Sequence, residues 1–366
     1  MRMNEQYSKH FHFLRFALGI ENEAPADMDW QGLYAFAMRQ TLVGVVFDGV
    51  QRMPKGNAPQ GKLLMDWLGE SMKIRSQNAK LDKASVEIYN AIGSRGYRGC
   101  ILKGQGNSIL YPNPATRTPG DVDVWVNASR NQIRALADEL VADGYKMGEE
   151  SLTHIEMTSP MGIPVEIHST PAIMNNPIHN HRLQKWLKRV ADLQCSNIVS
   201  LPNDAGNIAV PTASFNVVYQ LYHLFHHYFY EGVGLRQIVD YYYVVKNLPR
   251  MSQIGTDALL QRDLKHLGLW NFAGAVMYVL HEVLGMEEQD SIAPFDVQRG
   301  GMLLEEILAG GNFGKHDERY GFSKNAIGHN LQRLQRDMRL ARYYPTEALA
   351  EPFFRMWHFF WRMKNK

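Results

Sequence analysis

Hydrophobic and polar positions divide the chain into three stretches with different periodicities. Up to about residue 95, apolar side chains such as Phe11, Leu14 and Leu18 recur at helical spacing, which predicts helices. The stretch 63–92 predicts one long helix or two, because it contains few helix breakers. The segment 54–61, rich in Pro and Gly, predicts the loop that precedes this helix.

Between about residues 96 and 170 the spacing of apolar positions shortens to two, which is typical of strands. The predicted strands are 97–102, 121–126, 154–158 and 165–168. A Ser-Pro-Met-Gly turn at 159–162 joins the last two strands as a hairpin. Ser129 predicts the start of a helix, and Gly144 predicts its end.

After Pro171 the helical period returns. Helices are predicted at 214–224, 234–247, 257–284 and 332–344. The fold class is therefore α+β, with a small sheet between helical segments. We expect an N-terminal helical segment over 1–95, an α/β core over 96–200 and a C-terminal helical domain over 201–366.

Composition and charge exclude several classes of protein. The chain has 366 residues, 45% of them hydrophobic and 21% charged, which is ordinary for a globular protein. A formal net charge of +2 predicts neither a nucleic-acid coat nor an acidic partner. Cys100 and Cys195 lack a zinc-binding or CxxC spacing, so each is interpreted as a small buried residue.

The N-terminus lacks the apolar region of a secretory signal, and polar residues interrupt the apolar stretch 215–235. We therefore expect a cytoplasmic protein without a transmembrane segment.

Two aspartates separated by one residue lie on the predicted strand 121–126. Strand side chains alternate between faces, so Asp121 and Asp123 point to one face and Val122 and Val124 to the other. Two neighbouring carboxylates repel each other unless a cation lies between them. Mg²⁺ suits this role, because it takes one or two carboxylates together with substrate phosphates. An isolated D-x-D is more often two solvated aspartates, so the flanking residues decide its interpretation.

A third carboxylate follows on a later predicted strand. Glu166 and His168 share one face of that strand, and Glu166 is able to complete a three-carboxylate metal site. Glu156 on the neighbouring strand is the alternative. His154 and His168 are candidate donors that orient the carboxylates. The alternative for both histidines is a satisfied polar residue on a sheet face.

Upstream of the aspartates, a phosphate contact is predicted. The strand 97–102 ends at Lys103 and Gly104, and a short helix follows, a pattern able to hold phosphate. A solvated lysine at a turn is the alternative interpretation of Lys103.

At these positions the sequence resembles the uncharacterised nucleotidyltransferase family of the polymerase-β-like superfamily. The resemblance rests on Leu-Lys-Gly at 102–104, Leu-Tyr-Pro at 110–112, Arg117, Gly-Asp-Val-Asp at 120–123, Gly-Tyr at 144–145, His154, Val-Glu-Ile-His at 165–168 and Gly-Val-Gly-Leu-Arg-Gln-Ile-Val-Asp at 232–240.

The resemblance implies a mixed-sheet nucleotidyltransferase core and a role for each motif. Lys103 and Gly104 take the place of the phosphate-binding turn, Asp121 and Asp123 that of the metal-binding pair, and Glu166 that of the third carboxylate. Arg117 would stabilise charge that develops on phosphate. The chain has Gly-Gln at 104–105 where the superfamily has Gly-Ser, and Glu where Asp is commoner as the third carboxylate.

The resulting hypothesis is an enzyme that transfers a nucleoside monophosphate from an NTP to an acceptor. One or two Mg²⁺ ions on Asp121, Asp123 and Glu166 would assist, with Mn²⁺ as an acceptable substitute. The acceptor stays open between a protein, RNA, a sugar and a small molecule. A metal-dependent glycosyltransferase that uses a nucleotide-sugar is one alternative, although no parallel βαβ series precedes the D-x-D. A non-catalytic nucleotide-binding or regulatory module is the other.

Two further pairs at helical i, i+4 spacing have simple structural interpretations. His223 and His227 could bind a transition metal, but helix packing is favoured because no carboxylate stands at a motif-like position beside them. Arg236 and Asp240 are interpreted as an ion pair along one helix. A place for this pair beside the nucleotide is the alternative.

Overall fold

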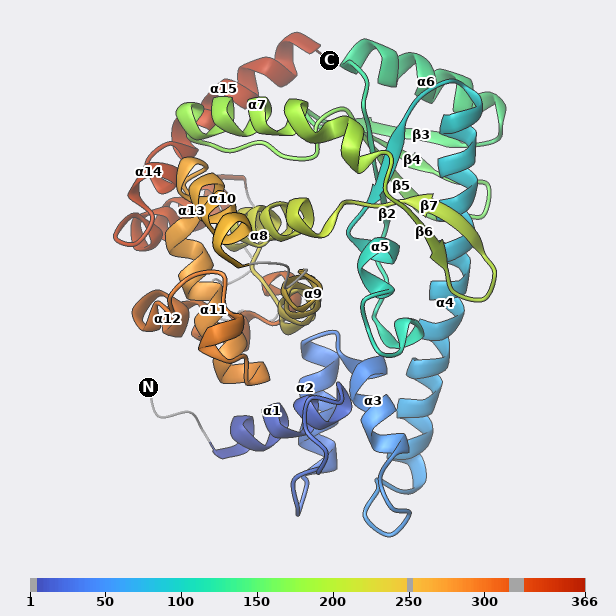
Figure 1. Cartoon of the computed structure of the whole chain (residues 1–366), viewed down its shortest axis with the longest axis vertical. Helices are drawn as coiled ribbons and strands as arrows, with labels where there is room; N and C mark the ends of the chain where they lie inside the picture. Colours follow the sequence, from blue (N-terminus) through green and yellow to red (C-terminus); the bar gives the residue numbers. More distant parts are fainter. Residues whose placement is uncertain (1–4, 249–252, 316–325, 366) are drawn as a thin grey trace.

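The computed structural model describes residues 5–248, 253–315 and 326–365, and it begins with a helical segment (Figure 1). Three short helices lie together at one end, and α4 extends from them along most of the height of the molecule. The Trp67 indole of α4 donates to the Val43 carbonyl of α3 at 3.2 Å, which joins the two helices. Bounds are α1 Glu5–Ala17, α2 Trp30–Arg39, α3 Val43–Gln51 and α4 Gly61–Ser94.

A five-stranded mixed sheet follows, with the order β1-β2-β5-β4-β3. Only β2 and β5 are parallel, and the chain passes from one to the other through α6 (Arg130–Ala142), β3 and β4. Ser129 forms a capping box at the start of α6, and Gly144 ends the turn after it with φ 90°. The strands are β1 Gly99–Leu102, β2 Val122–Val126, β3 Lys146–Glu150, β4 His154–Thr158 and β5 Pro164–His168.

The two faces of the sheet contact different parts of the molecule. Val122 and Val124 belong to a buried core that the sheet shares with α4 and α6. Trp125 points the opposite way, and its ring stacks on Phe215 of α8 with centroids 5.7 Å apart. Because strand side chains alternate, Asp123 shares the Trp125 face, which is the face toward the C-terminal helices.

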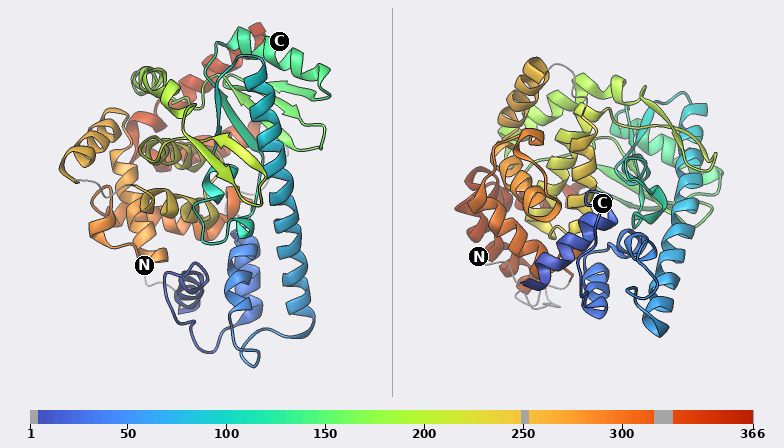
Figure 2. Two further views of the ribbon diagram at one scale, coloured as in Figure 1. Left: turned by 45° about the vertical axis from the view of Figure 1, so that its right-hand side comes forward. Right: turned by 60° about the horizontal axis from the view of Figure 1, so that its bottom comes forward.

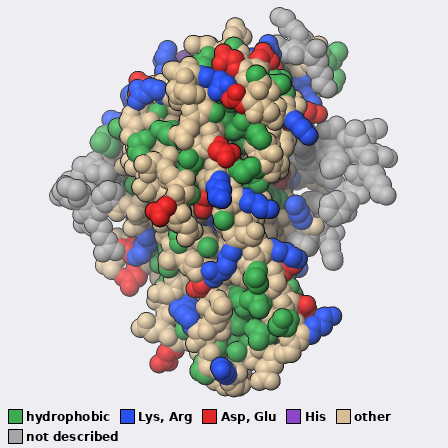
Figure 3. Space-filling view, turned by 90° about the vertical axis from the view of Figure 1, so that its right-hand side faces the viewer, with side chains coloured by type: hydrophobic (Ala, Val, Ile, Leu, Met, Phe, Trp, Pro, Cys, Tyr) green, Lys and Arg blue, Asp and Glu red, His purple; other side chains and the backbone are tan. Residues whose placement is uncertain are grey.

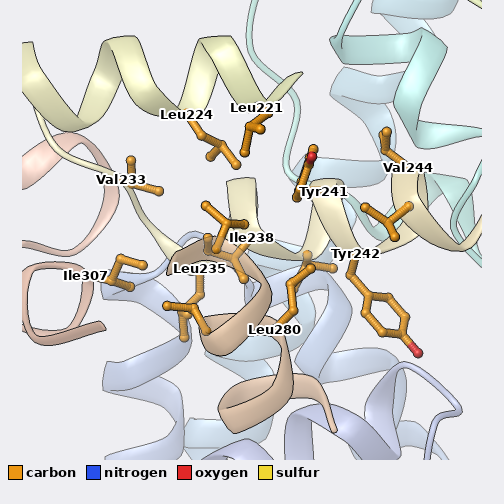
Figure 4. Close-up of a cluster of buried hydrophobic side chains, with 14 of the residues drawn as sticks. Leu221, Leu224, Val233, Leu235, Ile238, Tyr241, Tyr242, Val244, Leu280 and Ile307 are labelled. Carbon is orange, nitrogen blue, oxygen red and sulfur yellow. The ribbon is translucent and has the colours of Figure 1, made fainter. Parts of the chain in front are cut away.

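The C-terminal helices share one large buried core with the N-terminal helices, and side chains from α8, α9 and α11 meet in it (Figure 4). Two views show these helices on the side of the sheet opposite α4 (Figures 1 and 2). The bounds are α7 Pro177–Gln194, α8 Ala213–Tyr230, α9 Leu235–Lys246, α10 Gln253–His266, α11 Trp270–Leu284, α12 Val297–Gly310, α13 Ala326–Ala341, α14 Pro345–Ala348 and α15 Glu351–Asn365. The remaining short helices are α5 Gly104–Ser108, η1 Pro114–Thr116, η2 Glu288–Asp290 and η3 Asn312–Gly314.

The predicted α+β class is confirmed, as are the four predicted strands and the buried state of both cysteines. After Pro171 the sequence predicted a return to helix and no strands, but β6 (Ile198–Leu201) and β7 (Gly206–Ala209) form a hairpin there. Strand β3 was also not predicted. The predicted helix 257–284 is two helices, α10 and α11, separated by a turn in which Gly268 has φ 75°.

Charge is spread rather than concentrated on the face shown in Figure 3, where acidic and basic side chains alternate around scattered apolar ones. Within the described part of the chain, no single helix has the length and hydrophobicity of a membrane span. The bent pair 258–266 and 270–284, at 118°, meets that test only when its two helices are combined.

Candidate active site

Strands β2 and β5 bring the three predicted carboxylates together. The parallel register pairs Asp123 with Glu166, so their side chains leave the sheet as neighbours on one face. Asp121 lies two positions before Asp123, and one carboxylate oxygen from each residue lies within 4.8 Å of the others. Glu156 lies one strand further away, opposite Glu166, and its side chain is 54% exposed against 27% for Glu166. The arrangement therefore favours Glu166 as the third carboxylate.

The negative charge of this group is only partly balanced by the protein. The charge of Asp123 raises the pKa of Asp121, and burial adds to that rise. Burial would also raise the pKa of Asp123, but Lys103 and His168 outweigh it and hold that pKa well below its usual range. Clustered carboxylate oxygens that repel each other are suitable ligands for a hard divalent cation. The residues present therefore fit Mg²⁺.

Lys103 follows β1 in a backbone conformation that is unusual for a residue with a side chain, with φ 51° and ψ −131°. Such conformations cost free energy and persist where the surroundings impose them, often at functional sites. The Lys103 ammonium lies 2.9 Å from Asp123 Oδ1, and its side chain is 18% exposed. The predicted turn after β1 is confirmed, and its lysine is ion-paired with a carboxylate of the site rather than solvated.

His168 connects two of the carboxylates. Its Nε2 lies 3.0 Å from Asp123 Oδ1 and 3.2 Å from Glu166 Oε2. Burial lowers the pKa of His168, but the two carboxylates outweigh this and raise it above its usual value. His154 faces His168 across β4 and β5, with its Nδ1 3.6 Å from Glu166 Oε2. Both histidines thus contact the carboxylates from the sheet itself.

Comparison with known proteins identifies the family. The sequence matches the family described as "Uncharacterised nucleotidyltransferase" over residues 26–285, well over half of the chain. The chain belongs to this family. Among solved structures, it is similar to the crystal structure of an antigenic nucleotidyltransferase-like protein from Paracoccidioides brasiliensis, with 15% identity, a TM-score of 0.32, and coverage of 62% of this chain and 96% of that one. A comparison of the sequence with curated proteins finds no match.

In this member of the family, Arg117 is buried in an ion pair with Asp240 of α9. Its Nε and Nη2 donate to the two oxygens of Asp240 at 2.7 and 2.8 Å, and the Tyr111 hydroxyl donates to the same carboxylate at 2.7 Å. From the sequence, an ion pair was predicted between Asp240 and Arg236, four residues before it on α9. Asp240 binds Arg117 instead, and no local pattern reveals a partner 123 residues away. Arg117 remains a predicted phosphate contact, but one that would compete with Asp240.

The histidine pair on α8 is arranged as a chain of polar contacts. The Nε2 atoms of His223 and His227 lie 3.0 Å apart, and His227 Nδ1 lies 3.0 Å from Glu231 Oε2. Among the described residues, the groups with three ligand atoms within reach of one ion all contain Glu166, and the α8 histidines belong to none. The sequence indicated no carboxylate beside this pair, but Glu231, directly after α8, contacts His227. Because these histidines belong to no three-ligand group among the described residues, the structural interpretation is still favoured.

Proposed function

We propose that this chain is a Mg²⁺-dependent nucleotidyltransferase that moves a nucleoside monophosphate from an NTP to an acceptor hydroxyl or amine. The observation that carries the proposal is the grouping of Asp121, Asp123 and Glu166, whose carboxylate oxygens lie within 4.8 Å of one another. Membership in the nucleotidyltransferase family supports the same reaction class. A cytoplasmic location remains a prediction.

In this proposal, Asp121, Asp123 and Glu166 would hold the metal. A bound Mg²⁺ would polarise the phosphate oxygens and neutralise charge at the reacting phosphorus. The reaction forms a bond from the acceptor atom to the α-phosphorus and breaks the bond to pyrophosphate. No covalent intermediate on the protein is needed, so the contribution of the chain is position and electrostatics.

The neighbouring side chains would hold the carboxylates in position to bind the metal. His168 and His154 contact Glu166, and His168 also contacts Asp123, so both histidines restrict the carboxylate rotamers. Lys103 balances the charge of Asp123 and, with Gly104, remains the predicted contact to the donor phosphates. These contacts support a preformed site on rigid strands.

Donor binding is the first experiment, because it needs no knowledge of the acceptor. Thermal shifts would be measured with ATP, CTP, GTP, UTP, and a set of UDP- and GDP-sugars, each with and without Mg²⁺. A ligand at a hundred times its Kd stabilises a fold by about 2.7 kcal/mol, which is readily detected. We expect a Mg²⁺-dependent shift with at least one NTP, absent in D121N/D123N.

Other outcomes would separate the alternatives. A shift with a nucleotide-sugar alone would favour glycosyl transfer. A shift with an NTP that persists in D121N/D123N and without Mg²⁺ would favour a nucleotide-binding module that does not use these carboxylates. No shift with any ligand would count against a donor site.

A further inference from the structure

Four cationic side chains lie around the carboxylates or the segment that leads into β2. They differ in whether a carboxylate forms an ion pair with them. Lys103 is paired with Asp123, and His168 with Asp123 and Glu166. Arg117 is paired with Asp240 through two hydrogen bonds. Arg236 differs, because within the described part of the chain no carboxylate lies within ion-pair distance of its guanidinium.

Arg236 lies in the first turn of α9 and reaches across to the residues directly before the metal site. Its Nη1 donates to the Thr118 carbonyl at 3.0 Å. The same atom lies 4.0 Å from the position that a Cβ on Gly120 would take, and Gly120 is bonded to Asp121. The guanidinium also lies 5.9 Å from the ring of Phe313. Arg236 therefore places a positive charge beside the chain that carries the first carboxylate.

The surroundings of Arg236 do not fully stabilise its positive charge. The Arg236 Nε is buried and meets no hydrogen-bond partner in the described residues. Burial, and then the nearby charge of Arg117, lower the pKa of Arg236, and the carboxylates of Asp240 and Asp121 offset this only in part. A half-buried cation that makes no ion-pair contact with a carboxylate is unfavourable unless another group compensates for it. An anionic ligand would supply both the missing charge and an acceptor for the guanidinium.

A purely structural role explains Arg236 less well. The loop before β2 is already joined to α9 by Arg117 and Asp240, one turn further along the same helix. The hydrogen bond from Arg236 to a neutral carbonyl uses one of its five N–H groups. An arginine is also the side chain best suited to hold two oxygens of one phosphate.

We propose that Arg236 binds the β- or γ-phosphate of the nucleotide donor, so that the C-terminal helical segment supplies part of the donor site. This inference rests on the proposed nucleotidyl transfer and assigns the contact to the phosphates that leave as pyrophosphate. Arg236 thereby distinguishes a triphosphate from a monophosphate, whereas the carboxylates act at the α-phosphate.

The test compares the affinity for phosphate chains of different length. Isothermal titration with Mg²⁺ would measure inorganic tripolyphosphate, ATP and AMP against the wild type, R236Q and R236K. Loss of a charged hydrogen bond predicts a roughly tenfold or greater loss of tripolyphosphate and ATP affinity in R236Q. We expect AMP affinity to be unchanged and R236K to recover part of the loss, because it retains the charge.

A matched control comes from Arg52, which also donates to backbone carbonyls and lies over a phenylalanine ring. Its Nη2 donates to the carbonyls of Phe16 and Ala17, and its guanidinium lies 4.5 Å from the Phe16 ring. R52Q should lose a comparable structural contact without any loss of tripolyphosphate affinity. Equal losses in R52Q and R236Q would show a general effect on folding and would overturn the inference.

Two further results separate this inference from the proposed function. If the wild type and R236Q bind tripolyphosphate and ATP equally, Arg236 is not the contact, although the nucleotidyltransferase proposal stands. If the wild type binds neither compound nor any other NTP with Mg²⁺, both proposals fail.

Discussion

At the scale of single residues, Lys103 combines a charge with a strained backbone, and two substitutions separate these properties. K103G and K103A both remove the ammonium from Asp123, but only glycine adopts φ 51° without a penalty from Cβ. We expect K103G to be more stable than K103A by about 1–2 kcal/mol in urea unfolding. Equal stabilities would mean that the backbone at this turn is not strained.

The residues of the site were predictable to the extent that they share one strand or neighbouring strands. Asp121 and Asp123 are visible as an alternating pair, and their proximity to Glu166 follows once β2 and β5 are adjacent and parallel. The alternation of Glu166 with Val165 and Ile167 indicates its face, but not the choice between Glu166 and Glu156. That choice depends on strand order, which the sequence pattern does not contain.

At the scale of elements, the buried ion pair between Arg117 and Asp240 joins the segment before β2 to α9. Among the described residues, R117M would leave the buried Asp240 carboxylate with the Tyr111 hydroxyl as its remaining hydrogen-bond donor. Loss of one partner from a buried pair costs about 3–5 kcal/mol. We expect a loss of this size in urea unfolding, and a smaller one for the double variant R117M/D240L, which removes both charges of the pair.

An exposed ion pair provides the control for this prediction. Arg98 and Asp192 lie 3.4 Å apart, with side chains 54% and 77% exposed. R98M should change stability by no more than about 1 kcal/mol. A similar cost for R98M and R117M, or a double variant at least as unstable as R117M, would contradict the structural role of the buried pair.

Several of the helices were predictable from their spacing, but α7, α12 and α15 were not predicted. Three short strands were also missed, for physical reasons. All five residues of β3 are exposed, so no apolar alternation marks this edge strand. Strands β6 and β7 have four residues each, too few for a clear period. Their hairpin follows α7 and packs beside α4 and β1, and such long-range packing decides the conformation of short segments.

At the scale of the whole molecule, Glu347 makes stability depend on pH. It is 5% exposed, and the backbone N–H groups of Asn175 and Asn176 donate to its carboxylate. Burial outweighs these hydrogen bonds and raises the pKa of Glu347 from 4.5 to about 7. Between these values the folded state binds more protons than the unfolded chain, so the contribution of Glu347 to stability falls as pH rises.

The variant E347Q removes this titration. We expect the stability of the wild type relative to E347Q to fall by about 2 kcal/mol between pH 5 and pH 8. Urea unfolding at pH 5, 6, 7 and 8 would measure the difference. A difference that stays constant or increases with pH would show that Glu347 is ionised in the folded protein throughout this range.

The proposed reaction depends on a divalent cation bound by Asp121, Asp123 and Glu166, and Mn²⁺ binding to E166Q and E156Q tests this most directly. Electron paramagnetic resonance would measure Mn²⁺ alone and with ATP. Because loss of even an outer partner of a metal ligand costs 10–100-fold, we expect roughly a tenfold or greater loss of Mn²⁺ affinity in E166Q. E156Q, changed one strand away on the same face, should bind Mn²⁺ as the wild type does. Equal Mn²⁺ affinity in the wild type and E166Q, or a loss confined to E156Q, would contradict a metal site that includes Glu166.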